Sequence, residues 1–238
     1  MLSPQLKNKS QKILLIGATG GIGSATAQTL MDQKVIVLGT GRRKKINATS
    51  LTEYFPLDLT KERDVRALAQ NIKKRYGSID WVIHAAGYID LRELKNDHSS
   101  PVIEKTFSIN TYSMLFLSKA FTPLLRKGGG FLALSSTAGI FGNPQFPIYS
   151  SSKGALNTLC IALARSLAPK KLSCMVLCPG PTNTSMRERI AHDASRQQDP
   201  KIIANVIARI IRNESPYKNG DVVIIRDSKE TLHSRYVS

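Results

Sequence analysis

The chain of 238 residues, 42% hydrophobic and 21% charged, has the composition of a globular protein with one or two domains. No apolar run approaches the roughly 18 residues of a membrane span, and the basic first residues lack the apolar core of a secretory signal, so we expect neither. The net charge of +17 suggests a polyanion partner. Because the basic residues are spread along the chain and do not alternate with aromatic residues, we expect no specific nucleic-acid binding.

Short apolar runs alternate with amphipathic stretches along the sequence. The short apolar runs predict buried strands at residues 12–17, 34–39, 54–58, 80–87, 131–136, 172–180 and 219–227. Helical spacing of apolar residues and breakers such as Gly and Pro predict helices at 24–33, 61–77, 101–126, 149–169 and 200–213. This alternation, with strands that are apolar throughout, predicts one doubly wound α/β domain with a parallel seven-stranded sheet and helices on both faces. We expect the domain to span residues 1–238, with 1–11 as a flexible tail, and ligands to bind at the carboxyl ends of the strands.

A glycine-rich segment, "GATGGIG" (17–23), follows the first strand and opens the first helix. Glycine permits a tight turn there and lets backbone N–H groups approach a pyrophosphate at the helix N-terminus. An ordinary glycine turn is the alternative, and a Walker A loop is excluded because no Gly-Lys-Ser/Thr follows. The segment predicts a dinucleotide site with contacts from Gly17, Thr19, Gly20, Gly21, Ile22 and Gly23.

Four consecutive basic residues, 42–45, follow the second strand. In a dinucleotide fold an acidic residue at this point selects NAD, whereas an arginine accommodates the 2′-phosphate of NADP. No acid occurs between Thr40 and Lys45, so we predict a preference for NADP(H) over NAD(H). Arg42 is the first expected contact and Arg43 the second, with Lys44 and Lys45 facing solvent. A solvated turn without a role is the alternative.

Hydroxyl groups follow the fifth strand at Ser135 and Ser136, and the next helix opens with Tyr149 and Lys153. Tyr and Lys four residues apart share a helix face, and a nearby ammonium is expected to lower the pKa of the phenol. Tyr149 is therefore a candidate proton donor and acceptor. Taken alone, Tyr-x-x-x-Lys is common by chance.

Together these motifs resemble the short-chain dehydrogenase/reductase family, in its compact single-domain Rossmann branch, over residues 10–228. Besides the glycine segment, the resemblance rests on Asp58 after the third strand, Ala86-Gly87 after the fourth and Asn110 in "FSINTYS". It is completed by Ser136, "YSSSK" and "PGPTNTSM". Within this family the sequence is most similar in type to 3-oxoacyl-carrier-protein reductases and carbonyl reductases.

The resemblance implies an NADPH-dependent enzyme that reduces a carbonyl to an alcohol, or the reverse, by hydride transfer. It implies that Ser136 orients the carbonyl, Tyr149 transfers the proton, and Lys153 holds the nicotinamide ribose and tunes Tyr149. Asn110 would hold a water in a proton relay. Further cofactor contacts are implied for Asp58, Leu59, Ala86, Gly87, Pro179, Gly180, Thr182 and Thr184.

The resemblance also implies a small carbonyl or alcohol substrate, with acyl thioesters as one candidate class. A homodimer or homotetramer is expected on the helices at 101–126 and 149–169, where Leu115, Leu117 and Phe121 add apolar surface. Phe141, Phe146 and Met186 suggest an apolar substrate face, although packing explains each equally well. A non-catalytic NADP(H)-sensing regulator on the same fold is the alternative function, and a broken tetrad would mark it.

Some positions depart from the family pattern. Ile16 replaces the usual Thr before the first glycine, and His84-Ala85 replaces two asparagines. We interpret His84 as a hydrogen-bonded structural histidine, with a catalytic role as the alternative. The glycine spacing also fits the longer epimerase-like branch of the family. That branch has a separate substrate region, for which this chain has no room. The stretch 184–200 is short and predicts a small or open lid.

Three cysteines, Cys160, Cys174 and Cys178, are an odd number in a chain of ordinary size, so we expect a reduced, cytoplasmic protein. Cys174 and Cys178 share a strand face and could be a metal pair. No His/Cys partner cluster exists elsewhere in the sequence, so buried hydrophobic residues and no metal site are expected.

Overall fold

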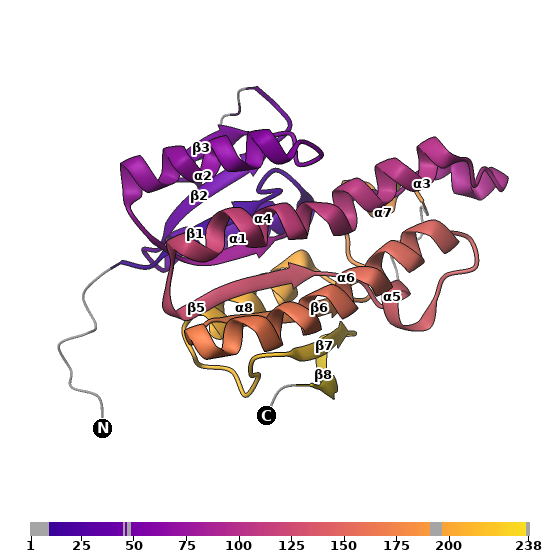
Figure 1. Cartoon of the computed structure of the whole chain (residues 1–238). Coiled ribbons are helices and arrows are strands. Elements are labelled where there is room, and N and C mark those ends of the chain that lie inside the picture. Colours follow the sequence, from indigo (N-terminus) through magenta and orange to yellow (C-terminus); the bar gives the residue numbers. More distant parts are fainter. Residues whose placement is uncertain (1–9, 45, 47–48, 191–196, 237–238) are drawn as a thin grey trace.

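The computed structural model describes residues 10–44, 46, 49–190 and 197–236, so the predicted tail lies mostly outside the described residues. Eight strands of the described chain form one sheet in the order β3-β2-β1-β4-β5-β6-β7-β8 (Figure 1). The first seven strands pair in parallel. Their bounds are β1 Lys12–Ile16, β2 Ile36–Gly41, β3 Glu53–Pro56, β4 Ile79–His84, β5 Leu125–Leu134, β6 Ser173–Pro179 and β7 Asp221–Arg226. The doubly wound α/β class predicted from the sequence is confirmed.

The eighth strand, β8 (Lys229–Arg235), was not predicted from the sequence and runs antiparallel to β7. Its sequence, KETLHSR, contains a single large apolar residue because an edge strand is not covered on both faces. Asp227 and Ser228 connect the two strands with φ of 50° and 60°. A two-residue turn with positive φ at both positions matches the right-handed twist of a hairpin, so the sheet ends in a tight β7–β8 hairpin.

Helices cover both faces of the sheet, as predicted (Figure 1). In β1, Ile13 and Leu15 pack in the core beneath α1 (Gly21–Asp32) and α8 (Pro200–Ile211). The alternate residues Leu14 and Ile16 pack in the core beneath α2 (Glu62–Tyr76), α4 (Ser113–Phe121) and α6 (Pro147–Leu167). Both faces of each central strand are therefore buried, which explains its continuous apolar sequence.

The helix predicted at 101–126 is interrupted. It consists of α3 (Ser100–Phe107), a π-helical turn η3 (Ser108–Tyr112), α4, and a 3-10 turn η4 (Thr122–Leu124), and β5 begins at Leu125. The three glycines at 128–130 belong to β5 and not to a loop. A Cβ on Gly129 would lie 1.8 Å from Asp80 O, and one on Gly130 would lie 2.0 Å from Ser173 O. Only glycine therefore lets β4, β5 and β6 approach so closely.

The apolar residues expected to form an interface on this helix face different ways. Leu117 and Phe121 are fully buried in the protein's own core, so their assignment to an interface is wrong. Leu115 and Tyr112 remain 45% and 47% exposed. Among the described residues, no helix combines the length and apolar character that crossing a membrane would need.

Candidate functional site

The ends of three parallel strands meet at the carboxyl edge of the sheet. Gly17, just after β1, has φ of 81°, and a Cβ there would lie 2.7 Å from the backbone N of Ala86, just after β4. A Cβ on Gly21 would lie 2.4 Å from Thr184 Cγ2, in the segment after β6. The glycine segment thus packs against both neighbouring loops, and side chains at these two positions would separate them.

The first turn of α1 is suited to an anion. A Cβ on Gly23 would lie 2.1 Å from Gly17 O, so the turn closes tightly on itself. Among the described residues no side chain caps this helix, whose N-cap is Gly20, and its first turn contains no acidic residue. The first N–H groups of a helix have no partner within it and carry partial positive charge. The loop 17–23, with Thr19 and Ile22, therefore fits the pyrophosphate of a dinucleotide.

The basic stretch after β2 lies beside this loop. A Cβ on Gly41 would be 2.9 Å from Thr19 Oγ1 and 2.8 Å from the Tyr54 hydroxyl, and that hydroxyl donates to Arg43 O at 2.9 Å. Arg42, Arg43 and Lys44 are exposed, whereas Lys45 lies outside the described residues. Within the described ranges, no carboxylate forms an ion pair with either arginine. Both guanidinium groups can therefore meet an incoming phosphate.

Asp58, after β3, is an ionised acceptor at the same edge. Its Oδ1 accepts hydrogen bonds from Thr60 N at 3.0 Å and Thr60 Oγ1 at 2.7 Å, and Lys61 Nζ lies 3.3 Å from Oδ2. These hydrogen bonds, with Lys61, lower the pKa of Asp58. Leu59 is partly buried against the core. Asp58 keeps capacity to accept from an adenine amine, although part of it is used within its own turn.

Ser136 and Tyr149 are in direct contact. Their side chains are close enough for Ser136 to favour the ionised form of the phenol, and Ser136 Oγ accepts from Ala138 N at 3.1 Å. Burial raises the pKa of Tyr149 to about 12. The predicted lowering of this pKa by Lys153 is therefore wrong: loss of hydration raises the pKa, and the opposing effect comes from Ser136.

Lys153 extends into the interior from the next turn of α6. Its Nζ donates to Leu134 O at 2.9 Å and lies 5.9 Å from the centre of the Tyr149 ring. The residue is 3% exposed, and burial lowers the pKa of the ammonium to about 8. A Cβ on Gly87 would lie 3.7 Å from this Nζ, 3.7 Å from Met186 Cε and 4.0 Å from Asn110 Oδ1. These side chains therefore surround Gly87.

Asn110 is fully buried in the π-helical turn. Its Nδ2 donates to Tyr88 O at 2.8 Å and to Ser152 Oγ at 2.9 Å, while Oδ1 accepts from Tyr88 N at 2.8 Å. The two amide hydrogens are thus used within the protein, and one lone pair of Oδ1 remains. Asn110 ties the loop after β4 to α6, and π-helical turns of this kind are frequent at functional sites.

The loop after β6 is fixed by its own hydrogen bonds. After Pro179, Gly180 N donates to Ile225 O at 2.8 Å, and Thr182 Oγ1 donates to Gly180 O at 2.9 Å. Thr184 caps α7 (Ser185–Glu188) by accepting from Arg187 N at 3.3 Å. The segment predicted to be a small lid lies only partly within the described residues, because 191–196 are outside them.

His84 and the cysteines are buried. His84 Nε2 lies 2.7 Å from Ser113 Oγ, and burial lowers the pKa of the imidazole to about 3. A neutral, hydrogen-bonded histidine fits the structural interpretation. The three cysteines are free, and no group of three or more His, Cys, Asp or Glu in the described residues could hold a metal ion.

The three residues expected to form an apolar substrate face differ in their exposure and contacts in the structure. Phe146 is fully buried, so for this residue the packing alternative holds. Phe141 is 65% exposed, and Met186 lies over Gly87. One further residue, Glu93, was not predicted from the sequence: its carboxylate accepts from the backbone N of Tyr149 at 3.3 Å. No local pattern marks it, because the two residues are 56 positions apart.

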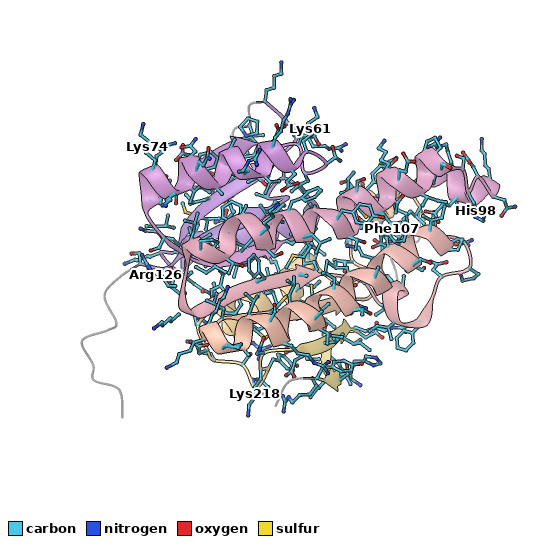
Figure 2. All side chains as sticks on the ribbon, in the orientation of Figure 1. Lys61, Lys74, His98, Phe107, Arg126 and Lys218 are labelled. Carbon is cyan, nitrogen blue, oxygen red and sulfur yellow. The ribbon has the colours of Figure 1, made fainter. Side chains whose placement is uncertain are left out.

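Positive charge is distributed around the molecule. Figure 2 shows Lys61, Lys74, Arg126 and Lys218 on different parts of its outline. Arg126 is paired with Asp80 at 3.2 Å and Lys61 with Asp58. This distribution resembles a generally basic surface more than a single nucleic-acid groove.

Comparisons with known proteins agree with this geometry. The family model described as short chain dehydrogenase matches residues 11–195. A 3beta-hydroxysteroid dehydrogenase from Mediterraneibacter gnavus is 30% identical over 198 residues, which cover 77% of this chain and 70% of that protein. A mouse 3-oxoacyl-[acyl-carrier-protein] reductase is 29% identical over 223 residues, covering 89% of this chain and 94% of the relative.

Solved structures share the fold. A short chain dehydrogenase from Burkholderia cenocepacia, in complex with NADP, is 22% identical and superposes with a TM-score of 0.83, covering 91% of this chain and 96% of that one. A xylitol dehydrogenase bound to NAD⁺ superposes with a TM-score of 0.84 at 22% identity, covering 92% and 99%. Because the family model covers most of the sequence, the chain belongs to the short chain dehydrogenase family and is an NAD(P)-dependent oxidoreductase.

Proposed function

We propose that this protein is an NADPH-dependent carbonyl reductase with Tyr149 as its proton donor. The observation that carries the proposal is the grouping of Tyr149 with Ser136 and with the buried Lys153, whose Nζ lies beside the loop after β4. A proton donor, a second hydroxyl and a cation thereby lie together, and the cation is beside the loop after β4, against which the glycine segment packs. Such convergence of titratable groups at the carboxyl edge of a parallel sheet is typical of an active site.

In the proposed reaction the cofactor supplies the hydride and the protein supplies the proton. The bound nicotinamide would supply the hydride that reduces the carbonyl carbon. Tyr149 would donate its hydroxyl proton to the carbonyl oxygen, completing the alcohol, while Ser136 holds that oxygen in place. With a pKa of about 12, Tyr149 retains its proton at neutral pH and is ready to act as an acid. Lys153 would hold the nicotinamide ribose, and Asn110 would act as a positioning residue.

The preference for NADPH over NADH rests on the segment after β2. Arg42 and Arg43 are exposed and have no acidic partner in the part of the chain that the structure describes. A guanidinium binds phosphate oxygens with paired hydrogen bonds, whereas a carboxylate at this place would repel them. Asp58 and Leu59 would border the adenine, and Thr182 and Thr184 the nicotinamide side of the cofactor.

Substrate, assembly and location follow as further parts of the proposal. A small carbonyl compound is the expected substrate, with 3-oxoacyl thioesters as one class, in keeping with the reductases among the relatives. We expect a homodimer or homotetramer that uses the helical segment 101–126 and α6. In that segment Tyr112 on η3 and Leu115 on α4 are exposed. Three free cysteines fit the cytoplasm, where thiols remain reduced.

The experiment is a substrate screen with purified protein. NADPH oxidation would be followed with ketones, aldehydes, quinones and 3-oxoacyl thioesters, each with a control lacking protein. The proposal expects at least one class to be reduced, and NADPH to outperform NADH on it. If NADPH binds but no compound in any class is reduced, the reductase proposal is contradicted and an NADP(H)-sensing role gains support.

A further inference from the structure

The first turn of α6, which carries Tyr149, has no cap of its own. Its N-cap position is Phe146, which offers no polar side chain, and Pro147 at the first helical position has no N–H. No acidic residue occurs in the first turn. The N–H groups of the second and third helical positions, Ile148 and Tyr149, normally need an acceptor from an N-cap side chain.

Glu93 supplies that acceptor from a distant part of the chain. It lies in the short helix η2 (Leu91–Lys95), and its Oε2 accepts from Ile148 N at 2.8 Å and from Tyr149 N at 3.3 Å. The residue is 2% exposed. A carboxylate at this end of the helix also faces the positive end of the helix dipole.

Hydrogen bonds and an ion pair hold the segment that carries Glu93. Tyr88 is bound through both its backbone groups to Asn110, and the Tyr88 hydroxyl donates to Asp90 at 2.9 Å. Asp90 caps η2 and pairs with Arg92 at 2.9 Å. Glu93 therefore lies on a segment between β4 and α3 that several hydrogen bonds and an ion pair hold in place.

Other contacts hold the following turn of α6, but at different residues. Asn110 and Thr111 bind the side chain and the carbonyl of Ser152, and Ser135 binds the carbonyl of Lys153. Among the described residues, Glu93 is the side chain that binds the backbone N–H of Tyr149. Its loss should therefore disturb the tyrosine more than the lysine.

We propose that Glu93 is a positioning residue for Tyr149, a long-range cap that fixes the first turn of α6 so that the phenol meets Ser136. This inference rests on the proposed function, in which Tyr149 donates the proton. It predicts a specific division of effects. The rate of proton donation should fall when Glu93 is removed, while cofactor binding at the glycine segment and Lys153 should persist.

The kinetic test compares Glu93→Ala with Glu104→Ala, an exposed glutamate on α3, on the carbonyl compound reduced fastest in the screen. Displacement of a reacting group by about 1 Å can lower a rate by about 10²-fold, so we expect kcat to fall roughly 10- to 100-fold for Glu93→Ala. The Kd for NADPH should not change, and Glu104→Ala should match the wild type. Val65→Ala, a buried change on α2, controls for destabilisation alone.

Two further variants keep the test decisive if Glu93→Ala does not fold. Glu93→Gln keeps the reach and an acceptor oxygen, whereas Glu93→Asp keeps the charge but is one methylene shorter. The proposal expects Gln to retain most of the rate and Asp to lose it. The opposite order, or equal kcat losses in Glu93→Ala and a Val65→Ala variant of similar Tm, would overturn it.

A readout without substrate completes the experiment. Hydrogen–deuterium exchange at the amides of Ile148 and Tyr149 should accelerate in Glu93→Ala and stay slow in Glu104→Ala. Unchanged exchange at these two amides would contradict the cap even if activity were lost. If Tyr149→Phe retained full activity, the proposed function would fail by itself, whatever the exchange result.

Discussion

Replacing Arg42 with alanine should weaken the binding of NADPH and leave that of NADH nearly unchanged. Arg42 follows β2 directly, with an exposed side chain, and the preceding Gly41 lies against Thr19 of the glycine segment. The end of β2 is therefore next to the place where a bound dinucleotide would turn toward its adenosine. NADH has no phosphate at that ribose, so it cannot gain from the guanidinium.

The size of the effect follows from the exposure of the side chain. A hydrogen bond to a charged group contributes about 1.5–3 kcal/mol. Water screens an exposed pair, which places Arg42 near the lower end of this range. About 1.5 kcal/mol corresponds to roughly a tenfold increase in the Kd for NADPH.

The assay is a titration of both cofactors against wild type, Arg42→Ala and Lys44→Ala at one ionic strength. Lys44→Ala removes the same charge from an exposed neighbour, so it reports the general electrostatic contribution. Equal losses for NADPH and NADH in Arg42→Ala would refute the phosphate contact. An acidic replacement of Gly41 is a poorer test, because its Cβ would lie 2.8 Å from the Tyr54 hydroxyl.

Three further predictions concern the pH profile, the glycine segment and assembly. Burial lowers the pKa of Lys153 to about 8, so the lysine loses its charge above that pH. We therefore expect kcat/KM for carbonyl reduction to fall as the pH rises through about 8, and an increase of kcat/KM in this range would contradict the prediction. Gly23→Ala places a Cβ 2.1 Å from Gly17 O and should lower the free energy of unfolding by about 1–3 kcal/mol. In Gly20→Ala the Cβ would lie 3.4 Å from the same oxygen, so this control should unfold like the wild type in thermal denaturation. Light scattering at micromolar concentration should give a dimer or tetramer that Leu115→Lys dissociates, and a monomeric wild type would refute the assembly.

The order of the central strands and helices could be predicted because each parallel strand is buried on both faces. Residues such as Ile13 and Leu14 must both be apolar when helices cover each side of β1. The same reasoning could not find β8, where only Leu232 is large and apolar and most side chains are exposed. An edge strand leaves a weak signal because one neighbour and one covered face suffice to hold it.

The candidate site was predictable where its motifs are local. Tyr149 and Lys153 are one helical turn apart, and the glycine segment is continuous, so their proximity follows from spacing. The position of Glu93 beside Tyr149 depends on how β4 and α6 pack, which no short pattern records. The direction of the pKa shift of Tyr149 was also missed, because it is determined by burial in the folded protein and not by the nearby lysine in the sequence.

The central claim, proton donation by Tyr149, is tested most directly with Tyr149→Phe. This change removes the hydroxyl and leaves the ring, so the fold and the Kd for NADPH should be preserved. Loss of a general acid costs about 10²–10⁴-fold in rate. The measurement is kcat for NADPH-dependent reduction of the best substrate, with cofactor binding determined on the same sample. We predict a loss within that range at unchanged Kd, and wild-type turnover by Tyr149→Phe would contradict the mechanism.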